Sequence, residues 1–178
     1  MPELPEVEIV KQSLDKNIKF EKIKKVVVRN RNLRFKISKN FEFFLTNKKI
    51  ERISRKSKYL ILHLSNNTFS IIHLGMSGTI HLLDKNNSIN NTNSSFYNSP
   101  NLPSKHNHVE IFLKKYRLIY NDPRRFGFIK IFKNKKTLLK FFNNIGPEPL
   151  NKKFNINYIF NYFINKKKNI KSFLLDQK

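Results

Sequence analysis

The start of the chain combines a potential amine nucleophile with carboxyl groups, in the run Met1-Pro2-Glu3-Leu4-Pro5-Glu6-Val7-Glu8. Removal of Met1 would expose the secondary amine of Pro2. An α-amino group has a pKa of about 7.7–8.0, so a useful fraction is unprotonated near neutrality and can form a Schiff base with a sugar or carbonyl carbon. Glu3 adjoins this amine and is suited to general acid catalysis. The alternative is that Pro2 and Pro5 only begin a helix.

Three further motifs place cationic, aromatic and thioether side chains close together. They are Lys56-Ser57-Lys58-Tyr59-Leu60, His73-Leu74-Gly75-Met76-Ser77-Gly78, and Asn121-Asp122-Pro123-Arg124-Arg125-Phe126-Gly127, which is followed by Ile145-Gly146-Pro147-Glu148-Pro149-Leu150. Any one of these motifs can arise by chance, so their order and joint presence carry the interpretation.

Each candidate residue in these motifs has a structural alternative. Lys58 can belong to a solvated run of charge, and His73, on an otherwise apolar strand, can be a satisfied core histidine. Met76 and Phe126 can be core residues, and Arg124 a surface residue. The glycines that flank these residues argue against the core alternative, because glycine suits exposed turns. Three of the 4 glycines in the chain lie here: Gly75, Gly78 and Gly127.

Composition indicates a basic protein without thiol chemistry. The chain has 178 residues with 36 Lys plus Arg against 12 Asp plus Glu, for a net charge of +24. Such a charge favours a polyanionic partner, either nucleic acid or an anionic membrane surface, although a nucleotide bias toward Lys codons is the plain alternative. The absence of Cys excludes disulfides and thiolate metal sites. Without a signal peptide or an apolar run of about 20 residues, we expect a cytoplasmic chain with no membrane association.

The candidate residues need elements to position them, and the first is a helix over 3–18. Val7, Val10, Leu14 and Ile18 share one face at spacings of three and four. The helix N-terminus would lower the pKa of the neighbouring amine and the Glu3 carboxylate would raise it, and the sequence leaves the balance open.

Short strands follow the helix. Their β-branched and apolar runs occupy 26–28, 59–64, 69–74, 79–83, 108–113, 117–121 and 128–132, with a hairpin turn at Asn66-Asn67. The Asn, Ser and Pro of 84–105 predict a mobile inserted surface loop. Helices are predicted at 136–142, 155–166 and 170–177. The expected fold class is α+β: a mostly antiparallel two-sheet β-sandwich with an N-terminal helix and C-terminal helices. We predict a catalytic sandwich domain over 1–135 and a helical tail over 136–178.

In order and spacing, the four motifs resemble the formamidopyrimidine-DNA glycosylase family from residue 1 to residue 178. The resemblance implies a DNA repair enzyme, a glycosylase and abasic-site lyase that removes oxidised purines such as formamidopyrimidine and 8-oxoguanine from double-stranded DNA. It implies that the Pro2 amine attacks C1′ of the deoxyribose and that β,δ-elimination then nicks the strand.

The resemblance also implies roles for individual carboxylates and cations. Glu3 would be the general acid and Glu6 would support the active site, although favourable charge near a helix start stays open for Glu6 and is the interpretation we prefer for Glu8. Lys58 would bind the phosphate flanking the lesion and assist catalysis. His73 and Arg125 would contact backbone phosphate.

Three residues would act on the base stack. Extruding a base leaves a hole that a side chain must fill. By resemblance, Met76 and Arg124 fill that void and Phe126 wedges the adjoining step. Arg124 would also hydrogen-bond the unpaired cytosine, as suits a planar side chain with several donors.

Family members continue beyond this length with a helix–two-turn–helix element and a four-cysteine zinc finger. The tail therefore resembles the start of a truncated helix–two-turn–helix region, and we expect weaker phosphate binding at physiological salt, no zinc, no other cofactor and a monomer. The alternative functions are an inactive relic of the enzyme, a non-catalytic DNA-binding module, or a basic RNA-binding protein, which none of the four motifs supports.

Overall fold

The computed structural model describes residues 2–84, 89–90, 103–167 and 169–174. The chain divides into two compact units, Met1–Lys135 and Lys136–Lys178. In chain order, the elements are α1 (Leu4–Ile18), β1 (Lys25–Val28), α2 (Phe41–Leu45), β2 (Ile50–Lys56), β3 (Tyr59–Leu64), β4 (Thr68–His73), β5 (Thr79–Leu83), β6 (Ile89–Asn90), a 3-10 turn η1 (Ser104–His106), β7 (Asn107–Phe112), β8 (Arg117–Asn121), β9 (Phe128–Phe132), α3 (Lys135–Phe142), α4 (Ile156–Phe163) and α5 (Ile170–Leu174).

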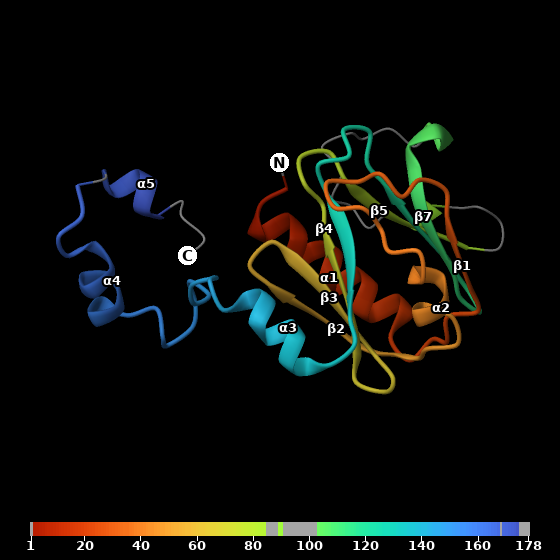
Figure 1. Ribbon diagram of the computed structural model, residues 1–178, viewed down its shortest axis with the longest axis horizontal. Helices are drawn as coiled ribbons and strands as arrows, with labels where there is room; N and C mark the ends of the chain where they lie inside the picture. The colour runs from red at the N-terminus through yellow and green to blue at the C-terminus, as the bar shows by residue number, and fades with distance from the viewer. Residues whose placement is uncertain (1, 85–88, 91–102, 168, 175–178) are drawn as a thin grey trace. The chain divides into compact units, whose positions relative to one another are not determined.

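The first unit is an antiparallel sandwich of two sheets (Figure 1). One sheet has the strand order β1-β7-β8-β5-β6 and the other β2-β3-β4-β9. Every strand pairing is antiparallel. The α+β sandwich predicted from the sequence is therefore confirmed.

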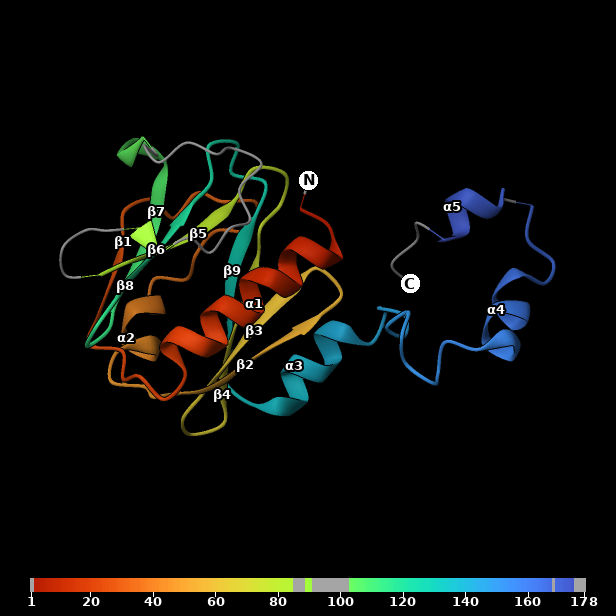
Figure 2. The ribbon, with the colours of Figure 1, turned by 180° about the vertical axis from the view of Figure 1, so that it is seen from behind.

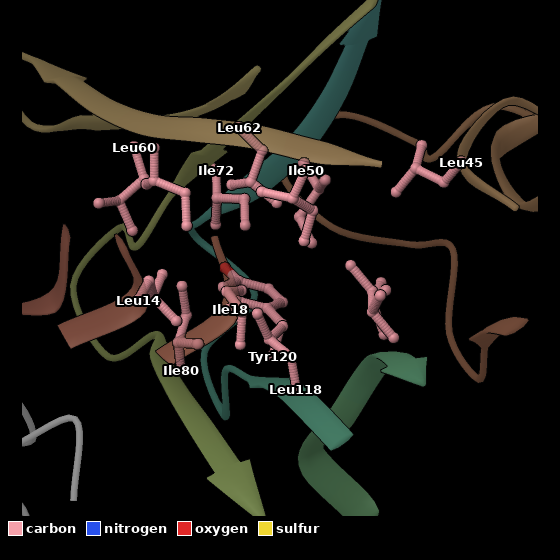
Figure 3. Close-up of a cluster of buried hydrophobic side chains, with 14 of the residues drawn as sticks. Leu14, Ile18, Leu45, Ile50, Leu60, Leu62, Ile72, Ile80, Leu118 and Tyr120 are labelled. Atoms are coloured by element: carbon pink, nitrogen blue, oxygen red, sulfur yellow. The ribbon is translucent and has the colours of Figure 1, made fainter. Parts of the chain in front are cut away.

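Helix α1 forms because its apolar residues recur on one face, and that face is the one it buries. Val7, Val10, Leu14 and Ile18 are all buried. The helix packs on β2 and β3, while α2 packs on β1 (Figure 2). Figure 3 shows Leu14 and Ile18 meeting side chains from both sheets in one hydrophobic cluster. The apolar face of α1 is thereby held against the sandwich along its length, from Val7 to Ile18.

The predicted strands agree with the observed ones to within one residue at each end, and before residue 84 the structure adds strand β2 and helix α2, which the sequence did not indicate. The hairpin turn at Asn66-Asn67 is confirmed, with positive φ angles at both residues. Strand β2 escaped prediction because a bulge between Ile50 and Arg52 breaks its apolar alternation. Helix α2 is only five residues long.

Part of the stretch 84–105 is regular structure. Ile89–Asn90 pairs with Leu82 and Leu83 of β5, and η1 begins at Ser104. The loop prediction for 85–88 and 91–102 lies outside the described residues.

In the second unit, α3 and α4 occupy the positions predicted for them, although α4 ends three residues earlier than expected. Phe173 of α5 contacts the rings of Tyr162 and Phe163, at 5.7 and 4.6 Å between centroids. The prediction for 175–177 lies outside the described residues. No helix in the described part of the chain is both long and apolar enough to cross a membrane.

Candidate functional site

The first turn of α1 presents one carboxylate to solvent and uses another to cap itself. Pro2 is buried and Glu3 is exposed beside it. The Glu6 carboxylate accepts a hydrogen bond of 2.7 Å from the backbone N–H of Glu3, which satisfies a donor at the helix start. Glu6 thus has a structural contact that explains its position, and the exposed Glu3 side chain forms the other half of this capping box with the backbone of Glu6.

Glu8 and Arg55 connect the start of α1 to the β2–β3 turn. Arg55 donates from Nε to Glu8 Oε2 at 2.7 Å and from a terminal guanidinium nitrogen to the Ser57 carbonyl at 2.8 Å. Burial alone would raise the pKa of Glu8, but the hydrogen bonds and charges of Arg55 and Lys11 outweigh it, so the pKa is lowered. Glu8 is therefore an ion-pair partner of Arg55 and Lys11, two contacts that the sequence did not indicate.

Lys58 lies in the two-residue turn between β2 and β3, immediately before β3 begins at Tyr59. Ser57, the first turn residue, has a positive φ of 50°. The next residue, Tyr59, pairs with His73 across the β3–β4 ladder. The positive charge of Lys58 acts on His73 and lowers its pKa. The turn therefore brings Lys58 into the neighbourhood of His73.

His73 is a half-buried, neutral imidazole. Burial first, and then the charges of Arg34 and Lys58, lower its pKa to about 4, with Asp122 acting in the opposite sense. Its ring stacks on Phe128 at 5.4 Å. Its Nδ1 accepts a hydrogen bond of 3.1 Å from the Gly75 N–H, so in the neutral ring the proton lies on Nε2. One nitrogen is thus used within the fold and the other is a donor.

Met76 and Phe126 are not core residues. Met76 is 44% exposed and Phe126 is 46% exposed, on turns that follow β4 and β8. The guanidinium of Arg124 lies 4.7 Å from the centre of the Phe126 ring. These turns therefore present an apolar, aromatic and cationic group to solvent.

The two turns touch through their main chains. Gly75 has a φ of +65°, and a Cβ on it would lie 2.4 Å from the backbone N of Gly127. A Cβ on Gly127 would lie 2.0 Å from the Tyr120 hydroxyl. Both positions require glycine, because a side chain would force the turns apart.

Asp122 forms hydrogen bonds to both of these turns. It was not identified as a functional residue from the sequence. Its carboxylate accepts from the Ser77 hydroxyl at 2.6 Å, from the Gly127 N–H at 2.8 Å and from the Tyr120 hydroxyl at 3.2 Å. Burial, and then the neighbouring carboxylate, raise the pKa of Tyr120 well above 10, which keeps its hydroxyl a donor. The available signal was a carboxylate at the end of a strand, directly before Pro-Arg-Arg.

Two cations flank these turns. Arg125 is exposed in the left-handed region, with a φ of 59°, and its backbone N–H donates to the Asp122 carbonyl at 3.2 Å. Arg34, which the sequence reasoning missed among 36 basic residues, donates its backbone N–H to the Gly127 carbonyl at 3.2 Å. Its charge lowers the pKa values of His73 and Tyr59, although burial leaves that of Tyr59 raised overall.

The structure therefore brings together the three predicted motifs of the first unit and the start of α1. Contacts link α1 to the β2–β3 turn, that turn to His73, and His73 to the glycine turns. The Gly146-Pro147 motif belongs to the second unit. Among the described residues no group of three or more His, Asp or Glu could hold a metal ion, and a chain without Cys does not fit a four-cysteine zinc site.

Comparisons with known proteins agree with this geometry. A family model described as the formamidopyrimidine-DNA glycosylase N-terminal domain matches residues 1–129. Proteins named formamidopyrimidine-DNA glycosylase from Wolbachia pipientis subsp. Culex pipiens (strain wPip) and Agrobacterium fabrum are 42% and 34% identical over 179 and 183 residues. These alignments include 100% of this chain but 60% and 61% of those proteins, so the chain spans about 60% of their length.

Solved structures give the same result. The Lactococcus lactis formamidopyrimidine-DNA glycosylase non-covalently bound to DNA containing an abasic site matches with a TM-score of 0.81 at 30% identity, over 98% of this chain and 62% of that one. The same Lactococcus enzyme with DNA containing Fapy-dG also gives a TM-score of 0.81 at 30% identity, covering 98% and 61%.

Proposed function

The chain belongs to the formamidopyrimidine-DNA glycosylase family, and from that membership we propose that it excises oxidised purines from double-stranded DNA and cleaves the abasic site. The observation that carries the proposal is the chain of contacts from α1 through the β2–β3 turn and His73 to two glycine turns, which expose Met76, Arg124 and Phe126. We place the reaction in the cytoplasm, where a chain without Cys needs no disulfide.

The proposed chemistry begins at the mature N-terminus. With Met1 attached, the Pro2 nitrogen is an amide and cannot attack, so its removal is required. The free amine forms a bond to C1′ while the glycosidic bond breaks and its electron pair leaves with the base. Glu3, exposed beside Pro2, supplies a proton to the departing base or to the ring oxygen. The attacking nitrogen then loses its proton and the C1′–O4′ bond breaks, with a proton taken up by O4′, which leaves an open-chain iminium. The iminium acidifies C2′, so that successive eliminations expel the 3′ phosphate and then the 5′ phosphate.

Phosphate contacts would position the sugar over the amine. Lys58 supplies a charge at the β2–β3 turn, which Arg55 ties to α1. Because its pKa is about 4, His73 would donate from Nε2 as a neutral group and release no counterion. Arg125 would add a charged contact beside it. Glu6, whose carboxylate caps α1, would support the site by holding the helix start in place.

The glycine turns would stabilise the extruded state. Unstacking a base costs a few kcal/mol, which contacts in the vacated space offset. Met76 and Arg124 would fill that space and Phe126 would enter the adjoining step. Arg124 is already held over the Phe126 ring, which limits its rotamers before DNA arrives. A guanidinium there can donate to the acceptor edge of an unpaired cytosine.

Borohydride trapping tests the proposal. The chain, with Met1 removal verified by mass spectrometry, is incubated with an abasic duplex and reduced, and we expect a covalent adduct at Pro2. A preparation retaining Met1 should give none. Glu3→Gln should slow base release from 8-oxoguanine by about 100-fold or more, whereas the matched exposed control Glu51→Gln should not. Absence of an adduct from the mature chain would overturn the proposal.

The comparisons do not favour a non-catalytic DNA-binding module, because the relatives and solved structures quoted above carry the enzyme's name. That alternative predicts binding to DNA without any trapped adduct, so the same assay separates the two.

A further inference from the structure

A buried carboxylate organises both turns that face the proposed DNA site without itself reaching solvent. Asp122 is 0% exposed. One of its oxygens accepts from the Ser77 hydroxyl, and the other accepts from the Tyr120 hydroxyl and the Gly127 N–H. Ser77 lies in the turn after β4, and Gly127 ends the turn after β8. Asp122 is therefore bonded to both turns at once.

Ser77 extends this connection to Arg124. The Ser77 hydroxyl donates to Asp122 and accepts the backbone N–H of Arg124 at 3.2 Å. The main chain on both sides of Phe126 is thus fixed: Arg124 through Ser77, and Gly127 through Asp122 directly. Ser77 is also the direct neighbour of Met76, so one polar cluster sets the backbone beneath all three exposed side chains.

The cluster continues towards His73. The Tyr120 hydroxyl that donates to Asp122 also lies 3.4 Å from the His73 carbonyl oxygen. The Asp122 carbonyl accepts from the buried His108 ring at 2.7 Å, and its N–H donates to the His106 carbonyl at 3.1 Å. Side chain and backbone of Asp122 are therefore both engaged, which leaves it little freedom to move.

We propose that Asp122 and Ser77 are positioning residues, which hold Met76, Arg124 and Phe126 at the spacing needed to occupy the space left by an extruded base. The proposal rests on the proposed function above. Neither residue is assigned any contact with DNA, because Asp122 is inaccessible and Ser77 is buried. Both carboxylate oxygens of Asp122 and the Ser77 hydroxyl have hydrogen-bond partners, and buried polar groups paired in this way restrict the structure to one arrangement, which is the property such a wedge requires.

A comparison of two substrates tests this role separately from folding. An abasic site in a duplex requires the void to be filled, whereas the same site in a single strand does not. For Ser77→Ala we expect kcat/KM for adduct formation to fall about tenfold or more on the duplex and to stay within about twofold on the single strand. Asp122→Asn, which exchanges one acceptor oxygen for an NH₂ group, should have the same selectivity.

Ser70→Ala is the matched control, since Ser70 is equally buried in β4 but lies outside the cluster. It should leave the duplex-to-single-strand ratio unchanged. Equal losses on both substrates, or no loss from Ser77→Ala, would overturn the proposal.

A binding measurement keeps the inference testable if the chain forms no adduct. Fluorescence of 2-aminopurine beside a stable abasic analogue reports unstacking without catalysis. We expect the unmodified chain to unstack the probe and Ser77→Ala to need about tenfold more protein to do so. An unmodified chain that does not unstack the probe, or a Ser77→Ala variant that matches it, overturns the inference. A missing adduct alone overturns only the proposed function.

Discussion

The two units of this chain keep their shapes by different means. In Met1–Lys135, α1 and both sheets contribute to one buried cluster that joins residues far apart in sequence. In Lys136–Lys178, α4 has no buried side chain and α5 has one, Phe173. Large apolar side chains stay exposed there, among them Ile156, Phe160, Ile164, Ile170 and Leu174.

This difference indicates which unit can hold functional side chains in fixed positions. Side chains that act on DNA must be held in place by a fold that opens rarely, and the buried cluster of the first unit provides it. Helices α4 and α5 of the second unit rely on ring contacts between near neighbours, which open locally at a lower free energy. The proposed reactive residues all lie in the first unit.

The largest expected difference is in the free energy of unfolding, between removal of a buried side chain in the first unit and removal of an exposed one in the second. Leu14→Ala removes a fully buried side chain of the first unit and should lower the free energy of unfolding by about 2–5 kcal/mol. Phe160→Ala, in the second unit, should change it by no more than about 0.5 kcal/mol, because Phe160 is exposed. Urea unfolding followed by circular dichroism measures both. Similar losses would mean that the units share one core.

Acid should affect the first unit selectively. All five histidines lie there, and burial lowers the pKa values of His63, His73 and His81 to about 4 each, with nearby cations adding to the effect at His63 and His73. Unfolded histidine titrates near pH 6.5, so between pH 6.5 and 4 the unfolded chain binds more protons.

The first unit should therefore keep its full stability above pH 6.5 and lose on the order of 1 kcal/mol or more for each histidine as the pH falls towards 4. In urea titrations at a series of pH values, His81→Gln should lose less unfolding free energy between pH 6.5 and 4 than the parent, by the contribution of one histidine. A second unit that lost helicity over the same window as the first would contradict this separation.

Phe173 should matter only locally. Phe173→Ala removes its contacts with Tyr162 and Phe163 and should lower the opening free energy of α4 and α5 by about 1–2 kcal/mol. Hydrogen exchange of these helices should accelerate, while that of β3 and β4 stays unchanged. Leu174→Ala, at an exposed neighbour, is the control. Faster exchange in the sandwich would show that the second unit supports the first.

The smallest expected effect concerns the link between α1 and the β2–β3 turn. Arg55→Gln removes an ion pair that is partly open to water and should reduce stability at pH 7 by up to about 1 kcal/mol. The Glu8 pKa is lowered in the folded chain, so this contribution is present above the unfolded pKa and is lost as the pH falls through the folded value. The variant and the parent should converge at pH values below the folded pKa of Glu8. A difference that persisted there would indicate lost packing instead.

Sequence patterns predicted the sandwich well because its strands are short β-branched and apolar runs that are largely buried, and because its turns use Asn and Gly. They failed where tertiary contacts decide the structure. The bulge in β2 disrupts its pattern, and Asp122 acquires its partners only when Ser77 and Tyr120 are brought to it. The choice between core and surface for Met76 and Phe126 was decided correctly by the neighbouring glycines, because their φ and packing requirements fit exposed turns.

The contact between Gly75 and Gly127 makes the backbone position of the two turns independent of the side chains that they carry. Because main chain meets main chain there, with no room for a methyl group, the height and angle of both turns do not depend on which side chains their tips carry. The side chains at the ends of the two turns can then be substituted without a change in the backbone that carries them. Substitution of Met76 or Arg124 should therefore leave the scaffold intact and, if the proposed function holds, alter only the contacts that these tips make with DNA.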